Sequence, residues 1–269
     1  MKYSSILLLS GLVAFSSCKE DNSKNGKSTW LPDVTNKDHG PLKQKEFKGD
    51  FDEIEVSQAI EAEVIKSDIE RVVISAPANI IDEVLVDNSG DELHIHYKTG
   101  FRVMNTNNVK AKIYTKDFSK LEANSAGIIV VRDQFTQDKT DIEISSSGHI
   151  SGKLEANDME IDAGSSGTFK GNVWAVNLNV EASSAGEVTI SGKAENAVLN
   201  SSSGSNISAK EVVAKNVNAE ASSGATLTIG VSSKFQAHAS SGGSIRGIKK
   251  GAVTTVSKEE SSGGSVSLQ

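Results

Sequence analysis

The sequence predicts an all-β protein whose main part is a right-handed parallel β-helix of about eight coils. Serine-rich and glycine-rich segments recur at a nearly constant period, and aliphatic residues keep fixed steps within each period. Aromatic residues make up only 5% of the 269 residues, while hydrophobic residues make up 37%. The interior must therefore be built mainly from Val, Ile, Leu and Ala, which suits a stack of small coils.

The repeat becomes clear when the first apolar residue of each copy is called position 0. These residues are spaced 18 to 21 residues apart, most often 19. Position +4 is then a serine in every copy, and position +8 is always apolar. A disordered spacer would not keep this register, and a period of about 19 residues is typical of solenoid coils. Position 0 is occupied by Leu121, Ile142, Ile161, Val180, Leu199, Ala219 and Ala237, and by Lys258 in an eighth copy.

Side chains alternate along a strand, so positions 0 and +2 should face the interior and position +1 should face outward. Small residues at positions +3 to +6 predict a sharp corner, where we expect the +4 serine to fill a small interior slot. A second strand follows, with positions +8 and +10 inward. A β-propeller is the alternative architecture, but its blades need about 40 residues each. A third, short side is indicated by Leu154 and Ala156, by Val173 and Ala175, and by Val212 or Val213.

The segment 44–120 has a different texture from the repeat region, 121–269. The runs "FDEIEVSQAIEAEVIKS" and "ELHIHYK" alternate apolar and polar residues, which predicts strands. The run "DNSGDE" predicts a hairpin turn, and residues 80–86 predict either a helical turn or another strand. We expect a less regular, β-rich N-terminal cap over the first coil, because an open β-helix end exposes unpaired strand edges.

The first 18 residues are typical of a bacterial lipoprotein signal peptide. Lys2 precedes an apolar run from Ile6 to Phe15, which is too short to span a membrane as a helix. Cys18 follows two small residues and is the only cysteine, so it cannot form an internal disulfide. We expect Cys18 to be lipid-modified and to anchor the chain in the membrane, with a simple cleaved signal as the alternative.

Residues 19–43 are polar and lack a period, so we interpret them as a flexible tether. The run from Lys19 to Asp21 resembles an export signal of surface lipoproteins. The predicted location is therefore the outer membrane, at the cell surface, with a periplasm-facing position as the alternative.

No motif of a phosphate loop, a dinucleotide site, a C-x-x-C pair or an H-E-x-x-H zinc site is present, and we expect no cofactor. The net charge of −7 argues against a nucleic-acid partner. Position +1 is mostly acidic, which we interpret as a solvated negative stripe. The alternative is a weak divalent-cation site centred on Glu143, Asp162 and Glu181, whose oxygen ligands suit calcium.

The order "FDEIEV", mixed β segments and then S-S-x-G repeats flanked by V-x-I or L-x-I resembles the family "putative auto-transporter adhesin, head GIN domain". The resemblance covers about Phe51 to the C-terminus, with a departure at "QAIEAEV". It implies a β-helix in the cell envelope with an adhesin-like binding role and no catalytic residues. Glycans or envelope proteins are the expected partners. A self-associating structural envelope protein is the alternative, and a carbohydrate-active enzyme is a more distant one.

Overall fold

Strands are the dominant element of the computed structural model, which describes residues 33–35, 40–103 and 108–269. Helical residues are few in this part of the chain and include a short 3₁₀ helix, Ile81–Glu83. The N-terminal strands are β1 (Asp33–Thr35), β2 (Leu42–Lys48), β3 (Glu53–Val56), β4 (Glu61–Lys66), β5 (Arg71–Pro77), β6 (Val84–Ser89), β7 (Glu92–Tyr97), β8 (Phe101–Val103) and β9 (Lys110–Thr115).

The repeat region contains shorter strands at its two ends and longer ones between them. These strands are β10 (Lys120–Ala123), β11 (Ile128–Val131), β12 (Phe135–Ile144), β13 (His149–Ala163), β14 (Thr168–Ala182), β15 (Glu187–Ser201), β16 (Asn206–Ala221), β17 (Thr226–Ala239), β18 (Ser244–Lys249), β19 (Thr255–Glu260) and β20 (Ser265–Leu268).

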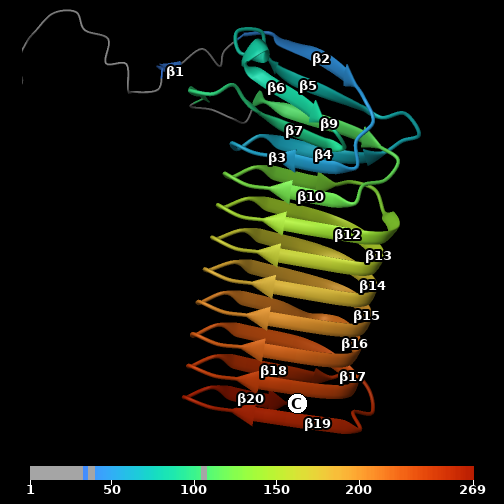
Figure 1. Ribbon diagram of the computed structural model, residues 1–269, viewed down its shortest axis with the longest axis vertical. Coiled ribbons are helices and arrows are strands. Elements are labelled where there is room, and N and C mark those ends of the chain that lie inside the picture. Colours follow the sequence, from blue (N-terminus) through green and yellow to red (C-terminus); the bar gives the residue numbers. More distant parts are fainter. Residues whose placement is uncertain (1–32, 36–39, 104–107) are drawn as a thin grey trace, which may run out of the picture. The chain divides into compact units, whose positions relative to one another are not determined.

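The predicted parallel β-helix is confirmed, and so is its register. Position 0 of each coil pairs with position 0 of the next, from Leu121 opposite Ile142 through to Ala237 opposite Lys258. The strands stack in parallel along one axis (Figure 1). Strands β13 to β17 are 14 to 16 residues long because each continues around the curved edge of its coil before the next sharp corner.

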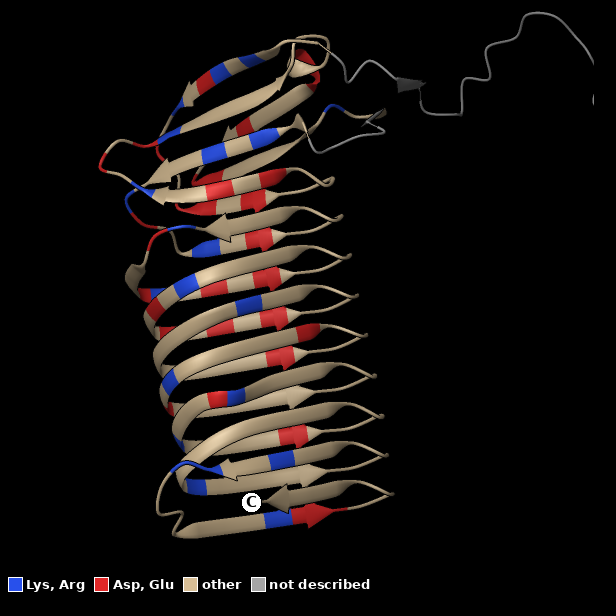
Figure 2. Ribbon diagram, turned by 180° about the vertical axis from the view of Figure 1, so that it is seen from behind, with Lys and Arg blue, Asp and Glu red and all other residues tan. Residues whose placement is uncertain are grey.

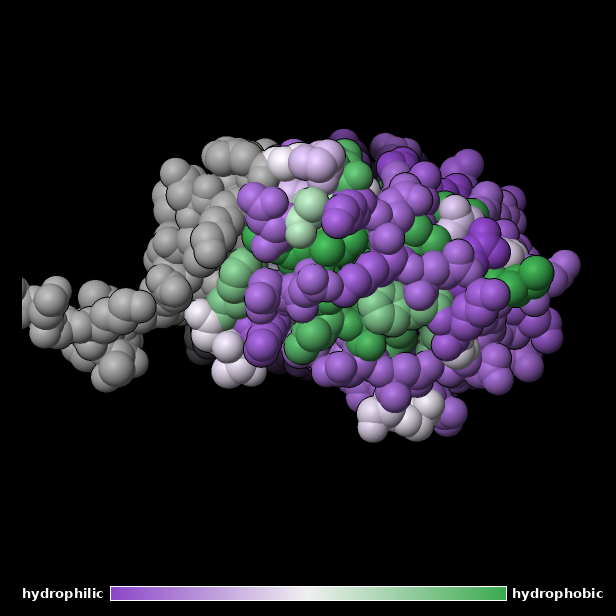
Figure 3. Space-filling model, turned by 90° about the horizontal axis from the view of Figure 1, so that it is seen from above, coloured by the Kyte–Doolittle hydropathy of each residue, from purple (hydrophilic) through white to green (hydrophobic). Residues whose placement is uncertain are grey.

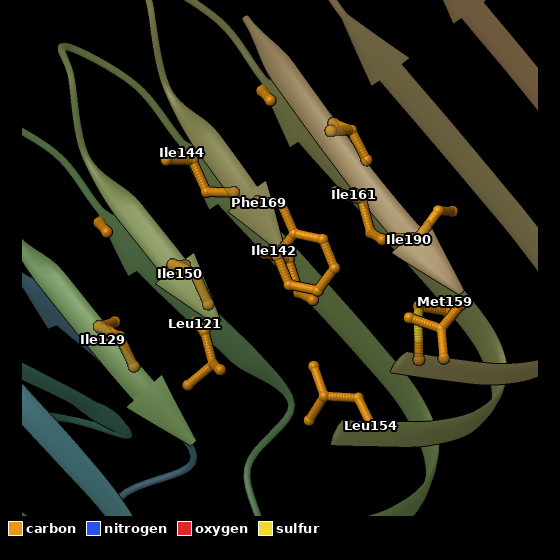
Figure 4. Packing of buried hydrophobic residues seen from close by; sticks show 14 of the residues in the cluster. Leu121, Ile129, Ile142, Ile144, Ile150, Leu154, Met159, Ile161, Phe169 and Ile190 are labelled. Carbon is orange, nitrogen blue, oxygen red and sulfur yellow. The ribbon is translucent and has the colours of Figure 1, made fainter. Parts of the chain in front are cut away.

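The core lies inside the coils, where the aliphatic columns of the repeat meet. Positions 0 and +8 are buried in the coils from Leu121 to Ile245. Figure 4 shows labelled members of these columns, including Ile142, Ile161 and Phe169, in the space that the coils enclose. Burying each aliphatic side chain stabilises the fold by about 1.5–3 kcal/mol. On the third side Val212 is buried and Val213 is 36% exposed, which settles the alternative that the sequence left open.

The corner is formed by backbone geometry, and the expectation that the +4 serine fills an interior slot is wrong. The +4 serines have φ between 46° and 53°, and the +5 residues have φ between 61° and 78°. Two successive left-handed residues are the requirement of a type I′ turn. Ser184 is consequently exposed at the tip of its turn. Position +6 lies inside instead. It is glycine in most coils, and a Cβ on Gly186 would sit 1.9 Å from the Ala163 carbonyl oxygen, whereas Ser205 and Ala225 occupy it in two coils.

The turns also stack on one another through their backbone. The amide of each +5 residue donates to the +4 carbonyl of the next coil, as from Ala126 to Ser146 at 2.9 Å. Within a turn the +6 amide donates to the +3 carbonyl, as from Gly127 to Asn124 at 2.7 Å. Every corner is therefore hydrogen-bonded along the stack and across its own turn, which explains how so polar a segment stays ordered.

The first part of segment 44–120 adds parallel strands to the stack, and other strands of this segment cover the end of the stack. Ile54 of β3 lies opposite Leu121, and Ala62 of β4 lies opposite Ile129, in the same parallel register as the repeats. Strand β7 pairs in parallel with β3, and strand β9 pairs in parallel with β4. Antiparallel strands then cover this end, with β5 on β9 and β2 on β5. Seen along the stack from the capped end, the surface mixes hydrophobic and hydrophilic residues (Figure 3).

The turns and short strands of the N-terminal part agree with some of the local predictions and differ from others. The predicted hairpin turn is confirmed, because β6 and β7 pair in antiparallel fashion around Gly90, whose φ is +71°. Residues 80–86 contain both predicted alternatives, the 3₁₀ helix and the start of β6. Parts of the expected tether are strands: β1 pairs with β8, and β2 begins at Leu42. The signal peptide and Cys18 lie outside the described residues. Within the described residues no helix is long and apolar enough to cross a membrane.

Candidate functional site

The predicted outward column at position +1 exists, and it is longer than the repeats suggested. Glu143, Asp162 and Glu181 lie directly opposite one another in neighbouring coils. Sequence reasoning missed its N-terminal extension, in which Glu55 lies opposite Glu122 and His94 lies opposite Glu55. The signal was present in the sequence. Glu55 follows Ile54 in "EIEV" as Glu122 follows Leu121 in "LEA", which places Glu55 at position +1. Figure 2 shows acidic segments recurring from coil to coil beside the tips of the strands.

Polar partners lie beside the carboxylates at the two ends of this column, and at its C-terminal end His238 Nδ1 lies 3.3 Å from Glu259 Oε2. Lys120 Nζ lies 3.0 Å from Glu143 Oε2 and 3.2 Å from Glu122 Oε2. Burial lowers the pKa of Lys120, but its hydrogen bonds to the two glutamates outweigh that effect and raise the pKa above its ordinary value. Asn124 Nδ2 donates to Glu55 Oε1 at 2.7 Å and to Glu122 Oε1 at 3.1 Å.

Asp162 and Glu181 have no such partner among the described residues. Burial, followed by the charges of Glu181 and Glu143, raises the pKa of Asp162 above its usual range. No group of three or more His, Cys, Asp or Glu side chains in the described part of the chain is arranged to hold a metal ion. The three carboxylates thus form a row along the stack, and a cation site at Glu143, Asp162 and Glu181 stays a prediction.

Asp162→Asn is expected to raise the melting temperature at pH 7. An acid whose folded pKa is raised stabilises the fold only below its unfolded pKa of about 3.9, and that contribution is lost as the pH rises through the folded pKa. The charged Asp162 therefore opposes folding at neutral pH, by no more than about 1 kcal/mol after solvent screening. Thermal melts at low salt should show the variant's advantage at pH 7 and its disappearance near pH 3.

Glu220→Gln is the matched control, because Glu220 lies between Asn200 and His238 in the same column. Glu220→Gln should change the melting temperature less than Asp162→Asn does. A lower melting temperature for Asp162→Asn at pH 7 would contradict the repulsion.

The second candidate is a groove on the curved side of the stack, which we call the tryptophan groove. Its volume is about 510 Å³, and Trp174 lines it with Asp52, residues 117–119 and 136–139, Ala156 and Asn157. Trp174 is 46% exposed, whereas Phe118, Phe135, Phe169 and Phe235 are fully buried. Sequence reasoning did not single out Trp174. The signal was available, because Val173 and Ala175 were assigned inward, which turns Trp174 outward.

The rim of the tryptophan groove is polar and ordered by hydrogen bonds. Asn157 Nδ2 donates to Asp138 Oδ1 at 3.0 Å, and the side-chain oxygen of Gln137 accepts from the Phe118 amide at 2.8 Å. The carboxylates of Asp52 and Asp117 have no hydrogen-bond or ion-pair partner within the described residues. An exposed indole beside free carboxylates and an amide can bind a ligand that offers both an apolar face and hydrogen-bonding groups.

The family model described as "Putative auto-transporter adhesin, head GIN domain" matches residues 50–250. The chain belongs to this family. The predicted resemblance is therefore confirmed, and the family's adhesin description points to the cell surface or envelope and away from an enzyme. None of the curated proteins compared with the chain matches it.

Solved structures with the same fold carry related descriptions. A "putative adhesin" from Parabacteroides distasonis ATCC 8503 has a TM-score of 0.76 at 18% identity, covering 86% of this chain and 98% of its own. A "putative adhesin" from Parabacteroides merdae ATCC 43184 has a TM-score of 0.74 at 19% identity, covering 86% and 97%. A "putative lipid binding protein" from P. distasonis ATCC 8503 has a TM-score of 0.71 at 20% identity, covering 86% and 97%. At these identities the likeness concerns the fold alone.

Proposed function

We propose that the chain is a cell-envelope lipoprotein with a non-catalytic, adhesin-like binding role, presented on a β-helical rod. The observation that carries the binding role is the tryptophan groove, where Trp174 is exposed although the other large aromatic side chains of the repeat region, Phe135, Phe169 and Phe235, are buried. A large, stiff and partly apolar side chain beside hydrogen-bonding groups is the usual anchor of a binding surface. Membership of the adhesin family supports the same role.

The envelope location rests on Cys18 and the apolar run before it. Lipidation of Cys18 would hold the protein in the outer membrane, and the "KED" run after it favours the cell surface over a periplasm-facing position. Cys18→Ala should release the mature protein from membranes or leave it unprocessed. Unchanged fractionation, together with a wild-type N-terminus that carries no acyl mass, would rule out the anchor. Protease treatment of intact cells distinguishes the surface from the periplasm.

Trp174→Ala is expected to weaken binding of the partner at least tenfold, the typical loss for a tryptophan anchor. A glycan and envelope-protein array would first identify the partner. The chain has two tryptophans, so a Trp30→Phe background leaves Trp174 as the sole fluorescent reporter of the groove. Titration should then change the Trp174 emission. Val213→Ala is the matched control, since Val213 is another exposed apolar residue of the curved side.

The same titrations separate binding from catalysis. Asp52, Asp117 and Asp138 line the groove, and glycoside hydrolysis requires a pair of carboxylates. Release of reducing ends from a bound polysaccharide would favour a carbohydrate-active enzyme. Saturable binding without turnover would favour the adhesin-like role, and equal affinity of the Trp174→Ala variant would move the binding site elsewhere.

A further inference from the structure

A second groove lies on the strands that follow the sharp corners, and we call it the lysine groove. Its volume is about 670 Å³, and its lining includes Lys153, Lys170 and Lys210, together with Gly152, Gly171 and Ile190. Neither the acidic column nor the tryptophan groove shares a residue with it. Its position follows from departures from the regular repeat, and its charge follows from lysines that have no ion-pair partner.

Two irregularities in coil length form the ends of the lysine groove. Val130 pairs with Ser151 but Phe135 pairs with Leu154, so the chain holds two extra residues between 130 and 135. Asp133 fixes this longer loop by accepting a hydrogen bond from the Lys66 amide at 2.8 Å. At the other end the register shifts between Thr189 and Ser191, where β16 bulges. The coils between the longer loop and the bulge of β16 keep the regular spacing.

The floor between these ends is the outer side of the backbone at position +10, where the side-chain positions face inward. Gly152 lies opposite Gly171, which lies opposite Ile190. A Cβ on Gly152 would sit 2.5 Å from the Val131 Cβ, and one on Gly171 would sit 2.9 Å from the Phe169 ring. The large Phe169 side chain fills the interior below, so the strand above it has no room for a side chain. The groove is therefore preformed by core packing.

The lysines of this groove are free, unlike many others in the protein. Lys153, Lys170 and Lys210 form no ion pair with any described residue, whereas Lys110, Lys120, Lys139 and Lys215 each pair with a carboxylate. Of the other charged side chains in the lining, Arg132 pairs with Glu63, and Glu211 Oε2 lies 3.8 Å from Lys250 Nζ. Three unpaired ammonium groups therefore face one carboxylate without an ion pair, that of Asp133, and the cavity is a local positive site. Asn172 and Ser191 add polar groups to the rim, where Asn172 Nδ2 donates to Ser191 Oγ at 3.0 Å.

We propose that the lysine groove binds a short stretch of an acidic polysaccharide, whose carboxylates meet the lysines and whose hydroxyls meet the amide and hydroxyl groups of the rim. This inference goes beyond the binding role proposed above: it adds a second site, which shares no residue with the tryptophan groove, and names the ligand class of that site. An acidic peptide fits less well. A peptide strand would need an unpaired sheet edge, and here the backbone of β14 is already paired with β13 and β15.

The test is calorimetric titration of the full mature protein with tetragalacturonate, beside neutral maltotetraose. The triple variant Lys153→Gln, Lys170→Gln and Lys210→Gln should lose affinity for tetragalacturonate by roughly tenfold or more, since each exposed charge contributes modestly. The matched control is Lys116→Gln, Lys193→Gln and Lys234→Gln, which removes the same charge at exposed positions outside the groove. It should stay within about twofold of wild type. Unchanged melting temperatures would show that both variants fold.

Each other outcome overturns the proposal in a distinguishable way. If the groove variant binds tetragalacturonate as tightly as wild type, the site is wrong although the adhesin-like role stands. If wild type binds no acidic saccharide, the ligand class is wrong, and the array experiment decides the adhesin-like role independently. If polyglutamate binds as tightly and with the same dependence on the three lysines, the groove recognises charge alone. Binding of maltotetraose with equal affinity would exclude a role for the carboxylates.

Discussion

Val188→Asp is expected to destroy the stability of the stack, with a loss on the order of 4 kcal/mol or more. Val188 has no exposed surface and occupies position +8, between Phe169 and Ile207 of the neighbouring coils. An aspartate there would bury a carboxylate with no partner in an aliphatic column. Because each coil buries its neighbours' inner faces, the damage should spread beyond one coil. Thermal and urea melts followed by circular dichroism would measure the loss.

The neighbouring variant, Thr189→Asp, is the control for register. Thr189 faces outward and lies opposite Lys170, so a new carboxylate there would meet water and a cation. We expect a change within about 0.5 kcal/mol, as for most surface substitutions. If Thr189→Asp destabilised the protein more than Val188→Asp, the inward and outward faces would have to be exchanged, because a slip of one residue reverses every side chain of a strand.

The core columns could be predicted because strand periodicity and coil length leave only one consistent register. Residues such as Leu121, Ile142 and Ile161 recur at the coil length, and alternation then decides which neighbours point inward. The position of the corner could be predicted in the same way, but its backbone conformation could not. Serine at +4 was assigned inward because it is small, whereas its place is set by a left-handed backbone that exposes it. Residue size indicates a tight turn, but it does not give the sign of φ.

The candidate sites were harder to predict because they depend on exceptions to the repeat. The outward column followed from register, and only its extension to Glu55 and His94 was missed, because their coils lie in a segment with weaker periodicity. The coil lengths of 21 and 20 residues were visible in the sequence. The longer coils lie on either side of the glycines that line the lysine groove. This arrangement becomes apparent only when the structure places Phe169 beneath Gly171. Such a cavity depends on contacts between coils, which spacing alone does not show.

The C-terminal end of the stack should resist self-association, and removing two charges should reverse this. Strand β19 pairs only with β17 and β20 only with β18 among the described strands, so no described strand covers their outer edges. Lys258 and Glu260 stand at positions 0 and +2 of this last coil, where the other coils place small or aliphatic side chains. Glu260 Oε1 also accepts a hydrogen bond from the Val266 amide at 2.6 Å. Charges at inward positions are a known protection of open sheet edges.

We therefore expect the protein lacking residues 1–18 to be monomeric, and the double variant Lys258→Ile and Glu260→Val of the same fragment to dimerise through its C-terminal ends. Dimers should form in preference to filaments, because antiparallel strands cover the other end of the stack (Figure 1). Sedimentation over a hundredfold range of concentration would measure this, with Glu259→Gln as the control, since Glu259 belongs to the outward column. Filaments of the wild-type protein would favour the structural alternative for its function. A double variant that stays folded and monomeric throughout would show that the two charges do not block this end.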